Sequence, residues 1–502
     1  MQLQDLVINS SKLYPNSIAV KAEDGSLTYS ELNGLANRIA RALTQLGVLE
    51  GDRVALWLDK SVRTVAAMQA ILRLGAAYVP IDPQSPVMRV QAIMKNCQIK
   101  ALVTNYKRAE KVLVDDFCSL PSLSTTEKWQ NGIGWKELNS FSDEPIPSIN
   151  RDENQLAYIL YTSGSTGIPK GVCISHRNAL AFIEWATEEM KLVNSDRLSN
   201  HAPFHFDLSV FDLYAAFLCG ASVNLIPEGI SYLPTKLVEF LQEHQITVCY
   251  CVPSALVLMI EHAKLLEQSL PSLRAIIFAG EPFAIKYLRR LRDSWPTLRL
   301  LNWYGPTETN VCTSYEVFEI EKDRNVPVPI GKPCCGDEAW PMKINGEIAQ
   351  IEEEGELIVS GPTVMLGYWG LAPQDNQPYA TGDIVRLQAD GNYIYIGRRD
   401  HMVKIRGHRI ELGDIEAALL EHEKIKEVGV VVIGSGLESR LAACITCVDN
   451  QKHPTLLEIK QHCAKRLPRY MIIDEIHFSD SQPRTSTGKI NRKELKRMLE
   501  ES

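Results

Sequence analysis

The sequence of 502 residues predicts an α/β protein with a large N-terminal domain of mainly parallel sheets and helices, an antiparallel β subdomain, and a small C-terminal α+β domain. Three observations predict it. Short apolar runs alternate with helical patterns in the first half, which is typical of parallel sheets covered on both faces. Short alternating strands with turns take over at about 327–385. A charged break at 398–401 then separates two strand-like runs, so we expect domains at 1–398 and 399–502.

The best-marked helix of the first half is expected from about Thr28 to Leu46. Thr28 and Glu31 form a capping-box pattern, the apolar residues that follow fall on one helical face, and Gly47 is a plausible stop. Buried strands are expected at 53–58, 76–81 and 100–104. Residues 119–150 are rich in Ser, Pro and Asn and are interpreted as a surface loop.

The run LAYILYTSGSTGIPKG, residues 156–171, is an apolar strand that leads directly into a loop rich in glycine and hydroxyl residues. Ligands of parallel sheets bind at the carboxyl ends of the strands. Glycines let the backbone wrap closely around a ligand, and Lys170 adds a mobile positive charge, so the loop suits a triphosphate. It lacks the Gly-Lys-Ser/Thr ending of a P-loop, which disfavours a kinase or P-loop ATPase.

The last hundred residues carry helix and strand patterns of their own. Their CxxC, Cys444 to Cys447, lies in the apolar run LAACITCV, which reads as a strand. Residues three apart in a strand face opposite sides, so a structural role is favoured over zinc or redox chemistry.

Composition excludes several classes of protein. A formal net charge of -8 argues against broad nucleic-acid binding. No run of about 18 apolar residues and no signal peptide is present, so we expect no membrane span. The twelve cysteines are scattered through a large chain, which indicates reduced thiols and a cytoplasmic setting.

Five further motifs accompany the glycine loop. They are NHAPFHFDLSVFD (200–212), FAGEP (278–282), NWYGPTET (302–309), YATGDIVR (379–386) with GRRDHMVKIRGHRIELGDIE (397–416), and PRTSTGKINRKE (483–494). In order and spacing they resemble the adenylate-forming enzymes, which include adenylation domains of nonribosomal peptide synthesis, acyl-CoA synthetases and firefly-type luciferases. The resemblance covers the whole chain.

The resemblance implies activation of a carboxylate by ATP with Mg²⁺. Glu308 would bind the metal, which prefers oxygen ligands. Tyr304 would stack on adenine, Asn302 would pair with its amine, Asp383 would accept the ribose hydroxyls, and Arg398 would help with ribose or phosphate. The full set of expected nucleotide-binding residues is Thr162, Ser163, Gly164, Ser165, Thr166, Gly167, Lys170, Gly280, Glu281, Pro282, Asn302, Tyr304, Gly305, Thr307, Asp383, Tyr395 and Arg398.

Lys489, in a Ser/Thr/Gly loop, is the expected catalytic residue of the small domain. The resemblance implies that it bridges the substrate carboxylate and the α-phosphate during adenylation only. The mobile small domain would then rotate about a hinge at Asp400 and present Lys404 and Gly407 for thioester formation.

Asp207 discriminates between classes of acid. An aspartate inside the apolar stretch FHFDLS is costly to bury without a cation, and the α-ammonium of an amino acid is a natural partner. Amino-acid-activating members of the family use an aspartate here in that way. The alternative is a helix N-cap.

The resemblance places the substrate pocket at Asp207, Leu208, Phe211, Tyr250, Ile277, Ala279, Trp303, Val311 and Cys312. Its bulky aromatic residues imply a small, compact, apolar amino acid. The lining resembles that of stand-alone prolyl-adenylating enzymes, so L-proline is the expected substrate. D-Alanine–carrier protein ligases are a close competitor, and valine or another small aliphatic amino acid comes third.

No carrier segment follows the last motif, so the acceptor thiol is expected on the phosphopantetheine arm of a separate carrier protein. Free coenzyme A is the alternative acceptor. A binding or regulatory protein that senses ATP or an amino acid is a rival class. It is disfavoured because Lys489, Glu308, Asp383 and Lys170 are all present.

Overall fold

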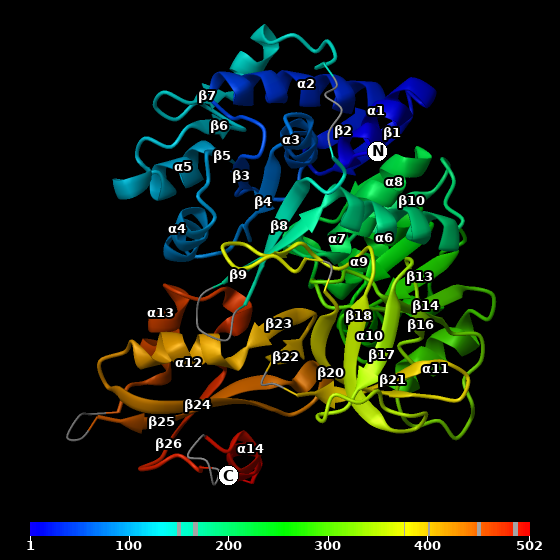
Figure 1. Ribbon diagram of the computed structural model, residues 1–502, viewed down its shortest axis with the longest axis vertical. Coiled ribbons are helices and arrows are strands. Elements are labelled where there is room, and N and C mark those ends of the chain that lie inside the picture. The colour runs from blue at the N-terminus through cyan, green and yellow to red at the C-terminus, as the bar shows by residue number, and fades with distance from the viewer. Residues whose placement is uncertain are drawn as a thin grey trace. The chain divides into compact units, whose positions relative to one another are not determined.

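The computed structural model describes residues 1–147, 152–163, 169–375, 377–399, 402–448, 453–484 and 490–501 (Figure 1). The chain forms two compact units. The first comprises Met1–Pro83, Met94–Tyr161 and Gly171–Arg399, and the second comprises Gln84–Ile93, Thr162–Lys170 and Asp400–Ser502. Sequence patterns did not indicate that the two short internal segments group with the C-terminal residues.

A nine-stranded sheet of the first unit has the order β16-β15-β14-β13-β12-β10-β11-β1-β2. Its central strands, from β14 to β1, pair in parallel, and the two edges are antiparallel. The strands are β1 (Ile18–Ala22), β2 (Gly25–Thr28), β10 (Arg197–Asn200), β11 (Ser222–Leu225), β12 (Val248–Cys251), β13 (Ala275–Phe278), β14 (Arg299–Tyr304), β15 (Thr313–Glu316) and β16 (Lys332–Pro333).

An eight-stranded sheet has the order β19-β9-β8-β4-β3-β5-β6-β7. The strands β3 to β7 pair in parallel and are buried, which explains why β4 and β5 are largely apolar in sequence. The strands are β3 (Arg53–Leu56), β4 (Ala77–Pro80), β5 (Ala101–Thr104), β6 (Ser122–Ser124), β7 (Ile133–Gly134), β8 (Leu156–Thr162), β9 (Lys170–Ser175) and β19 (Gly367–Tyr368).

The antiparallel subdomain is a four-stranded sheet of order β17-β18-β20-β21. Its strands are β17 (Glu338–Met342), β18 (Glu354–Ser360), β20 (Tyr379–Leu387) and β21 (Tyr393–Arg398). Residues 343–350 form a turn that returns to β17 through a bridge from Ile348 to Met342, as expected of short strands joined by turns.

Helices of the first unit follow many of these strands along the chain. They are α1 (Leu3–Leu13), α2 (Tyr29–Gln45), α3 (Val62–Arg73), α4 (Val87–Asn96, which is divided between the two units), α5 (Tyr106–Val112), α6 (His176–Glu189), α7 (Leu208–Val210), α8 (Ala216–Cys219), α9 (Pro234–Glu243), α10 (Pro253–His262) and α11 (Ile285–Ser294). A π-helical turn, η3 (Phe211–Ala215), joins α7 to α8.

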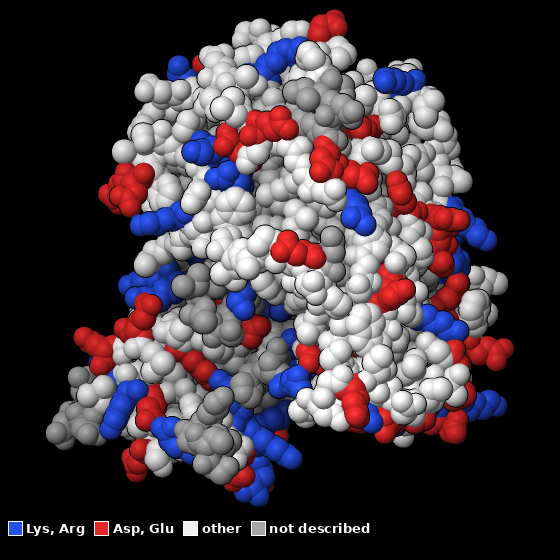
Figure 2. Space-filling view, in the orientation of Figure 1, with Lys and Arg blue, Asp and Glu red and all other residues white. Residues whose placement is uncertain are grey.

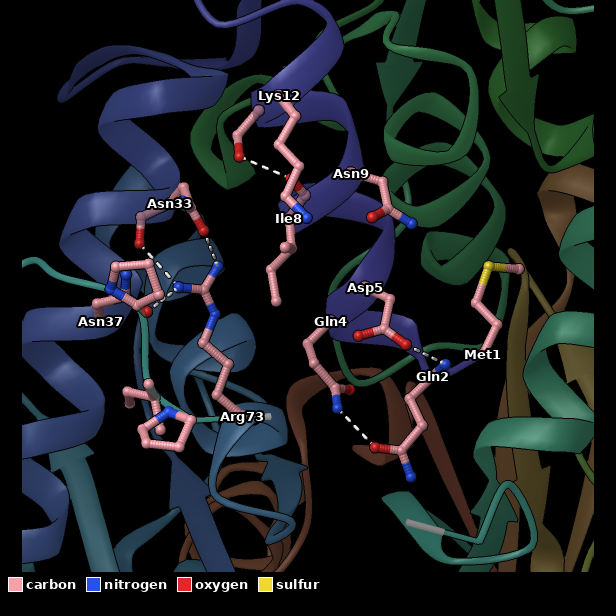
Figure 3. Close-up of a pocket in the computed structure, with 14 residues that line it drawn as sticks. Met1, Gln2, Gln4, Asp5, Ile8, Asn9, Lys12, Asn33, Asn37 and Arg73 are labelled. Carbon is pink, nitrogen blue, oxygen red and sulfur yellow. Dashed lines mark hydrogen bonds between the residues drawn. The ribbon is translucent and has the colours of Figure 1, made fainter. Parts of the chain in front are cut away.

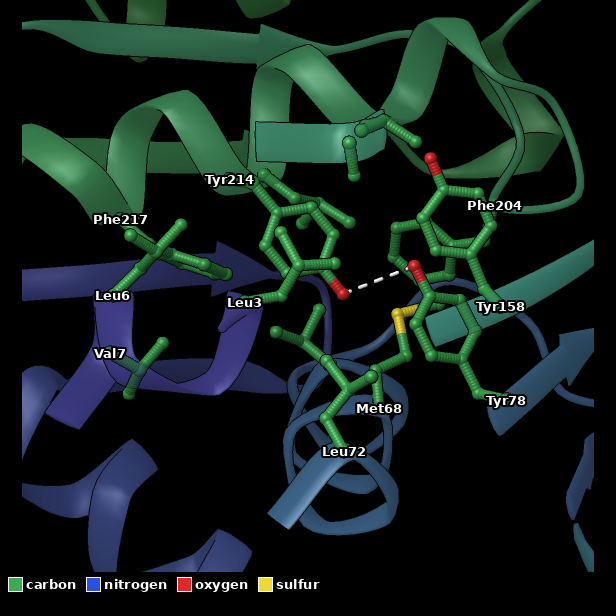
Figure 4. Close-up of a cluster of buried hydrophobic side chains, with 14 of the residues drawn as sticks. Leu3, Leu6, Val7, Met68, Leu72, Tyr78, Tyr158, Phe204, Tyr214 and Phe217 are labelled. Carbon is green, nitrogen blue, oxygen red and sulfur yellow. Dashed lines mark hydrogen bonds between the residues drawn. The ribbon is translucent and has the colours of Figure 1, made fainter. Parts of the chain in front are cut away.

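One large buried cluster joins the helices to both sheets (Figure 4). Near its middle the Tyr78 and Tyr158 rings stack with centroids 5.3 Å apart, and the hydroxyl of Tyr214 donates to that of Tyr78 over 3.1 Å. Tyr78 and Tyr158 come from the eight-stranded sheet, and Tyr214 comes from η3 beside the nine-stranded sheet. The two sheets therefore share one core.

The second unit has a three-stranded sheet, a short hairpin and three helices in its described C-terminal part. These are β22 (Met402–Ile405), β23 (His408–Glu411), α12 (Leu412–Leu420), β24 (Ile425–Ile433), β25 (Arg440–Cys447), α13 (Leu456–Ala464), β26 (Glu475–Phe478) and α14 (Arg492–Glu500). Cys444 is buried in β25 with Cys447 at its end, and both are free thiols. The prediction that the CxxC lies in a strand is confirmed.

The prediction of an α/β protein with an antiparallel subdomain is confirmed. The helix predicted from Thr28 begins as expected, because Thr28 caps α2 and exchanges hydrogen bonds with Glu31. The interpretation of residues 119–150 as loop is wrong in part, since β6 and β7 lie within it. No helix in the described ranges is long and apolar enough to cross a membrane.

Candidate active site

The predicted pocket residues of the first unit lie on neighbouring parallel strands and on the helix beside them. Tyr250 is on β12, Ile277 is opposite it on β13, and Trp303 is on β14. Ala279 follows β13, and Phe211 begins η3. Seven of the nine predicted residues are buried, namely Phe211, Tyr250, Ile277, Ala279, Trp303, Val311 and Cys312, while Asp207 and Leu208 are half-buried. The structure thus brings them to the carboxyl edge of the sheet.

Three of these side chains form a closed aromatic cluster. Phe211 and Trp303 meet edge to face with centroids 5.0 Å apart, and Tyr250 lies 5.4 Å from Trp303 and 5.7 Å from Phe211. Such edge-to-face pairs stabilise the fold by more than the burial of their surface area alone. The three rings therefore form one tightly packed group beside the carboxyl ends of the strands.

Sequence reasoning missed two residues that support this cluster. The ring centroids of Phe182 and Trp185, both on α6, lie 5.8 Å and 5.3 Å from that of Trp303. Their spacing of three residues, which places both on one helix face, is the signal that could have found them.

Asp207 is half-buried immediately before α7. It occupies the N-cap position, yet its side chain makes no capping hydrogen bond, so the N-cap interpretation is not supported. Burial raises the pKa of Tyr250 and of Tyr158, and the negative charge of Asp207 raises both further. The carboxylate therefore acts electrostatically on the aromatic groups around the pocket.

A hydrogen-bonded triad occupies the expected ribose position. The hydroxyl of Tyr304 donates to Asp383 Oδ2 over 2.5 Å, and Arg398 Nη1 donates to Asp383 Oδ1 over 2.9 Å. Asp383 and Arg398 are cross-strand partners on β20 and β21, and Asp383 is 1% exposed. Burial, followed by the charge of Asp383, raises the pKa of Tyr304, which keeps its hydroxyl a donor.

The loop after β14 is shaped by Gly305. A Cβ at this position would lie 1.6 Å from the carbonyl oxygen of Asn310, so only glycine allows the loop to fold back on itself. Asn302 Nδ2 donates to the carbonyl of Pro329 over 2.8 Å, which orients Oδ1 as the amide's acceptor. An acceptor is what the exocyclic amine of adenine requires.

The same loop buries Glu308 completely. The hydroxyl of Tyr368 donates to Glu308 Oε1 over 2.7 Å, and Tyr379 Oη lies 3.2 Å from that of Tyr368. Neither tyrosine was predicted. Within the described ranges no three ligating side chains gather as a metal site. One carboxylate fits Mg²⁺, because this ion commonly binds one or two carboxylates together with waters and phosphate oxygens.

The remaining predicted nucleotide-binding residues of the first unit follow β13 and β14 or lie on β21. Gly280, Glu281 and Pro282 come after β13, and Glu281 Oε2 accepts from the backbone N–H of Ser254 over 3.2 Å. Thr307 belongs to the Gly305 loop, and Tyr395 on β21 has its ring 6.4 Å from that of Tyr304.

The other predicted residues belong to the second unit. Ser163 Oγ donates to the carbonyl of Arg409 and accepts from the backbone N–H of Glu411. Thr162 ends β8, Lys170 begins β9, and Lys404 lies on β22 opposite Arg409. Gly164, Ser165, Thr166, Gly167, Asp400 and Lys489 lie outside the described residues.

A cavity of about 950 Å³ lies elsewhere in the first unit, between α1, α2 and Arg73 (Figure 3). None of the predicted site residues lines it. Acidic and basic side chains are interspersed on the face of the first unit seen in Figure 2, which gives no sign of a basic surface there. The cavity and this surface therefore add no residue to the candidate active site.

The chain is similar to known families and proteins over most of its length. The AMP-binding enzyme family matches residues 9–369, and the AMP-binding enzyme C-terminal domain matches residues 414–489. An L-proline--[L-prolyl-carrier protein] ligase of Pseudomonas fluorescens is 44% identical over 99% of both chains. One from Streptomyces coelicolor is 39% identical over 93% of this chain and 91% of its own. The Vibrio cholerae adenylation domain AlmE, solved with glycyl-adenosine-5'-phosphate, has the same fold, with a TM-score of 0.84 and 24% identity over 100% and 98% of the two chains.

Proposed function

The chain belongs to the AMP-binding enzyme family, and from that premise we propose that it is a ligase that activates L-proline with ATP and transfers it to a separate carrier protein. The observation that carries this proposal is the 44% identity to a prolyl-carrier protein ligase over 99% of both chains. The rigid aromatic cluster beside Asp207 supports it, because a compact ring with a charged secondary amine suits both features.

In the first step the carboxylate oxygen of proline attacks the α-phosphorus of ATP. The new O–P bond gives prolyl-AMP as the bond between the α-phosphorus and the oxygen that bridges to the β-phosphate breaks, and pyrophosphate leaves with that oxygen. Asp207 would hold the ammonium, and the aromatic cluster would hold the ring. Asp383 would accept the ribose hydroxyls, since its two oxygens are already oriented by Tyr304 and Arg398. Glu308 would hold Mg²⁺, which supplies neutralising charge at the phosphates.

Lys489 would bridge the two reacting anions in this step. In the second step a phosphopantetheine thiol, after losing its proton, attacks the acyl carbon and AMP leaves. We assign Lys404 to this step, with the second unit turning at Asp400. We also propose a cytoplasmic setting, because all twelve cysteines are free thiols.

Exchange of labelled pyrophosphate into ATP tests the first step. The expected result is exchange that depends on L-proline and exceeds the exchange with D-alanine, L-valine and L-pipecolate. Stronger exchange with D-alanine would make the chain a D-alanine–carrier protein ligase. No exchange with any amino acid, combined with measured ATP binding, would indicate a sensor.

Loading of the acceptor tests the second step. Labelled proline, ATP and the chain are incubated with a phosphopantetheinylated prolyl carrier protein or with free coenzyme A. The carrier should acquire label that hydroxylamine releases, while its apo form, which lacks the thiol, should not. Preferential formation of prolyl-CoA would contradict the proposed acceptor.

A further inference from the structure

A buried lysine holds the strand end from which the substrate-binding segment departs. Lys60 lies between β3 and α3 and is 9% exposed. Its ammonium donates to the carbonyl oxygens of Asn200 and His201 over 2.9 Å and 2.8 Å. Asn200 ends β10, and the chain runs from there to Asp207 and Phe211. One cation thus links the eight-stranded sheet to the start of this segment.

A second link holds the other end of the same segment. Asn200 Nδ2 donates to Asp212 Oδ2 over 3.1 Å, and both residues are fully buried. Asp212 directly follows Phe211 in the π-helical turn η3. Such turns often occur at functional sites. The Lys60–Asn200–Asp212 network therefore fixes both ends of residues 200–212, between which Asp207 lies.

The charges of this network depend on one another. Burial lowers the pKa of Lys60, and the carboxylates of Glu228 and Asp212 oppose that shift. Burial raises the pKa of Asp212, while the amide of Asn200 and the charge of Lys60 lower it. Asp212 Oδ1 has no hydrogen-bond partner among the described residues. Removing Lys60 would leave the carbonyl oxygens of Asn200 and His201 without their donor, which is unfavourable.

We propose that Lys60 is a positioning residue for amino-acid binding, which sets the placement of Asp207 and Phe211 by clamping the end of β10 against Asp212. This inference rests on the proposed amino-acid adenylation and deepens it. Lys60 touches backbone carbonyls and not the substrate, so its effect falls on the amino-acid KM and leaves the ATP site largely unchanged.

Lys60→Met tests the proposal, with Arg73→Met as matched control. Arg73 is also a buried cation, 5% exposed, that donates to a backbone carbonyl, that of Asn33, but it belongs to the contact between α2 and α3. In the exchange assay Lys60→Met should raise the proline KM at least about tenfold, because small misplacements of binding groups are expensive. The ATP KM should change by less than about twofold, while Arg73→Met should change neither.

The coupling to Asp212 gives a second readout. Asp212→Asn removes the carboxyl group that interacts with the charge of Lys60, so the double variant should have a lower proline KM than Lys60→Met alone. Simple multiplication of the two single-variant effects would contradict the pairing. A folded Lys60→Met protein with an unchanged proline KM would overturn the proposal. Lys60→Arg, which keeps the cation, should recover part of the parent's affinity.

Amide hydrogen exchange measures the positioning without turnover. The amide hydrogens of residues 201–211 should exchange faster in Lys60→Met than in the parent and in Arg73→Met. If Lys60→Met does not fold, the same increase is expected in Asp212→Asn. Unchanged protection of this segment would overturn the positioning role. If the parent shows no proline-dependent exchange of pyrophosphate into ATP, the proposed function is contradicted. The hydrogen-exchange test of Lys60 does not depend on that result.

Discussion

The hydroxyl of Tyr304 donates to Asp383 Oδ2 over 2.5 Å and so joins β14 of the nine-stranded sheet to β20 of the antiparallel sheet. The bond holds the Asp383 carboxylate from one side while Arg398 holds it from the other. We propose that Asp383 accepts the ribose hydroxyls, so the orientation of its carboxylate contributes to the affinity for ATP.

Tyr304→Phe should therefore raise the KM for ATP roughly tenfold, in keeping with the loss of a hydrogen bond to a charged group. The proline KM should change little. Exchange kinetics with each substrate varied in turn measure both values. Tyr393→Phe is the matched control, because its buried hydroxyl donates to the carbonyl of Ala339 over 2.7 Å in the same sheet, away from Asp383. An equal effect of both substitutions would contradict the assignment.

Asp207→Asn should raise the proline KM by a factor that corresponds to about 2–5 kcal/mol, the cost of breaking a buried charge pair. Asp196→Asn is the control. Asp196 is 3% exposed on its side chain and forms an ion pair of 2.8 Å with Arg274, at the opposite end of β10. Its loss should lower the melting temperature and leave the proline KM unchanged. A proline KM that Asp207→Asn does not alter would remove Asp207 from the site.

Phe211→Leu should relax the size limit of the pocket. The substitution removes the Phe211 ring from the aromatic cluster. L-Pipecolate has one methylene more than L-proline, and one methylene in an apolar pocket is worth about 1–3 kcal/mol in discrimination between substrates. The preference for L-proline over the larger L-pipecolate, measured as a ratio of kcat/KM, should fall about tenfold. Phe217→Leu, in the same core but on α8, should cost comparable stability and keep the preference.

Features encoded by neighbouring residues could be predicted from the sequence. The capping box of Thr28 and Glu31 is local, and α2 begins where it indicates. The strands β6 and β7 were missed because three and two residues are too few to show a periodicity. The pocket aromatics could be named only through resemblance, since they come from separate strands and a helix.

Lys60 could not be predicted as a site residue for a different reason. Its partners are backbone carbonyls about 140 residues away, and any residue type could present them. A lysine in a loop between strand and helix normally points to solvent. Only the packing of the two sheets against one core brings its ammonium to the end of β10.

Asp337 should make the free energy of unfolding fall as the pH rises. Burial raises the pKa of its carboxyl to about 7 from an ordinary 3.8, although the hydroxyl and backbone N–H of Thr363 oppose the shift. Between these values the folded state holds a proton that the unfolded state has lost, so unfolding becomes easier as the pH approaches 7.

Asp337→Asn, which cannot ionise, should therefore be more stable than the parent at pH 8.5, by about 1–4 kcal/mol, with the difference shrinking towards pH 4. Urea denaturation at both pH values measures it. Asp196→Asn should behave oppositely, because burial is outweighed there by Arg274 and other donors and the pKa is lowered. A stability difference for Asp337→Asn that does not depend on pH would contradict the shift.

Lys489→Ala should separate the two half-reactions. Lys489 lies outside the described residues, so its assignment rests on the motif RTSTGKIN and on the family. Loss of one group that stabilises the transition state lowers the rate by about 10²–10³, and adenylation should fall by at least that factor. Transfer from preformed prolyl-AMP to the carrier should survive, because the proposed second step uses Lys404 instead.

The matched control is Lys493→Ala, since Lys493 is an exposed lysine on α14, and this substitution should affect neither rate. Equal loss of both half-reactions in Lys489→Ala would mean that this lysine supports the structure of the second unit and does not bridge the reacting anions.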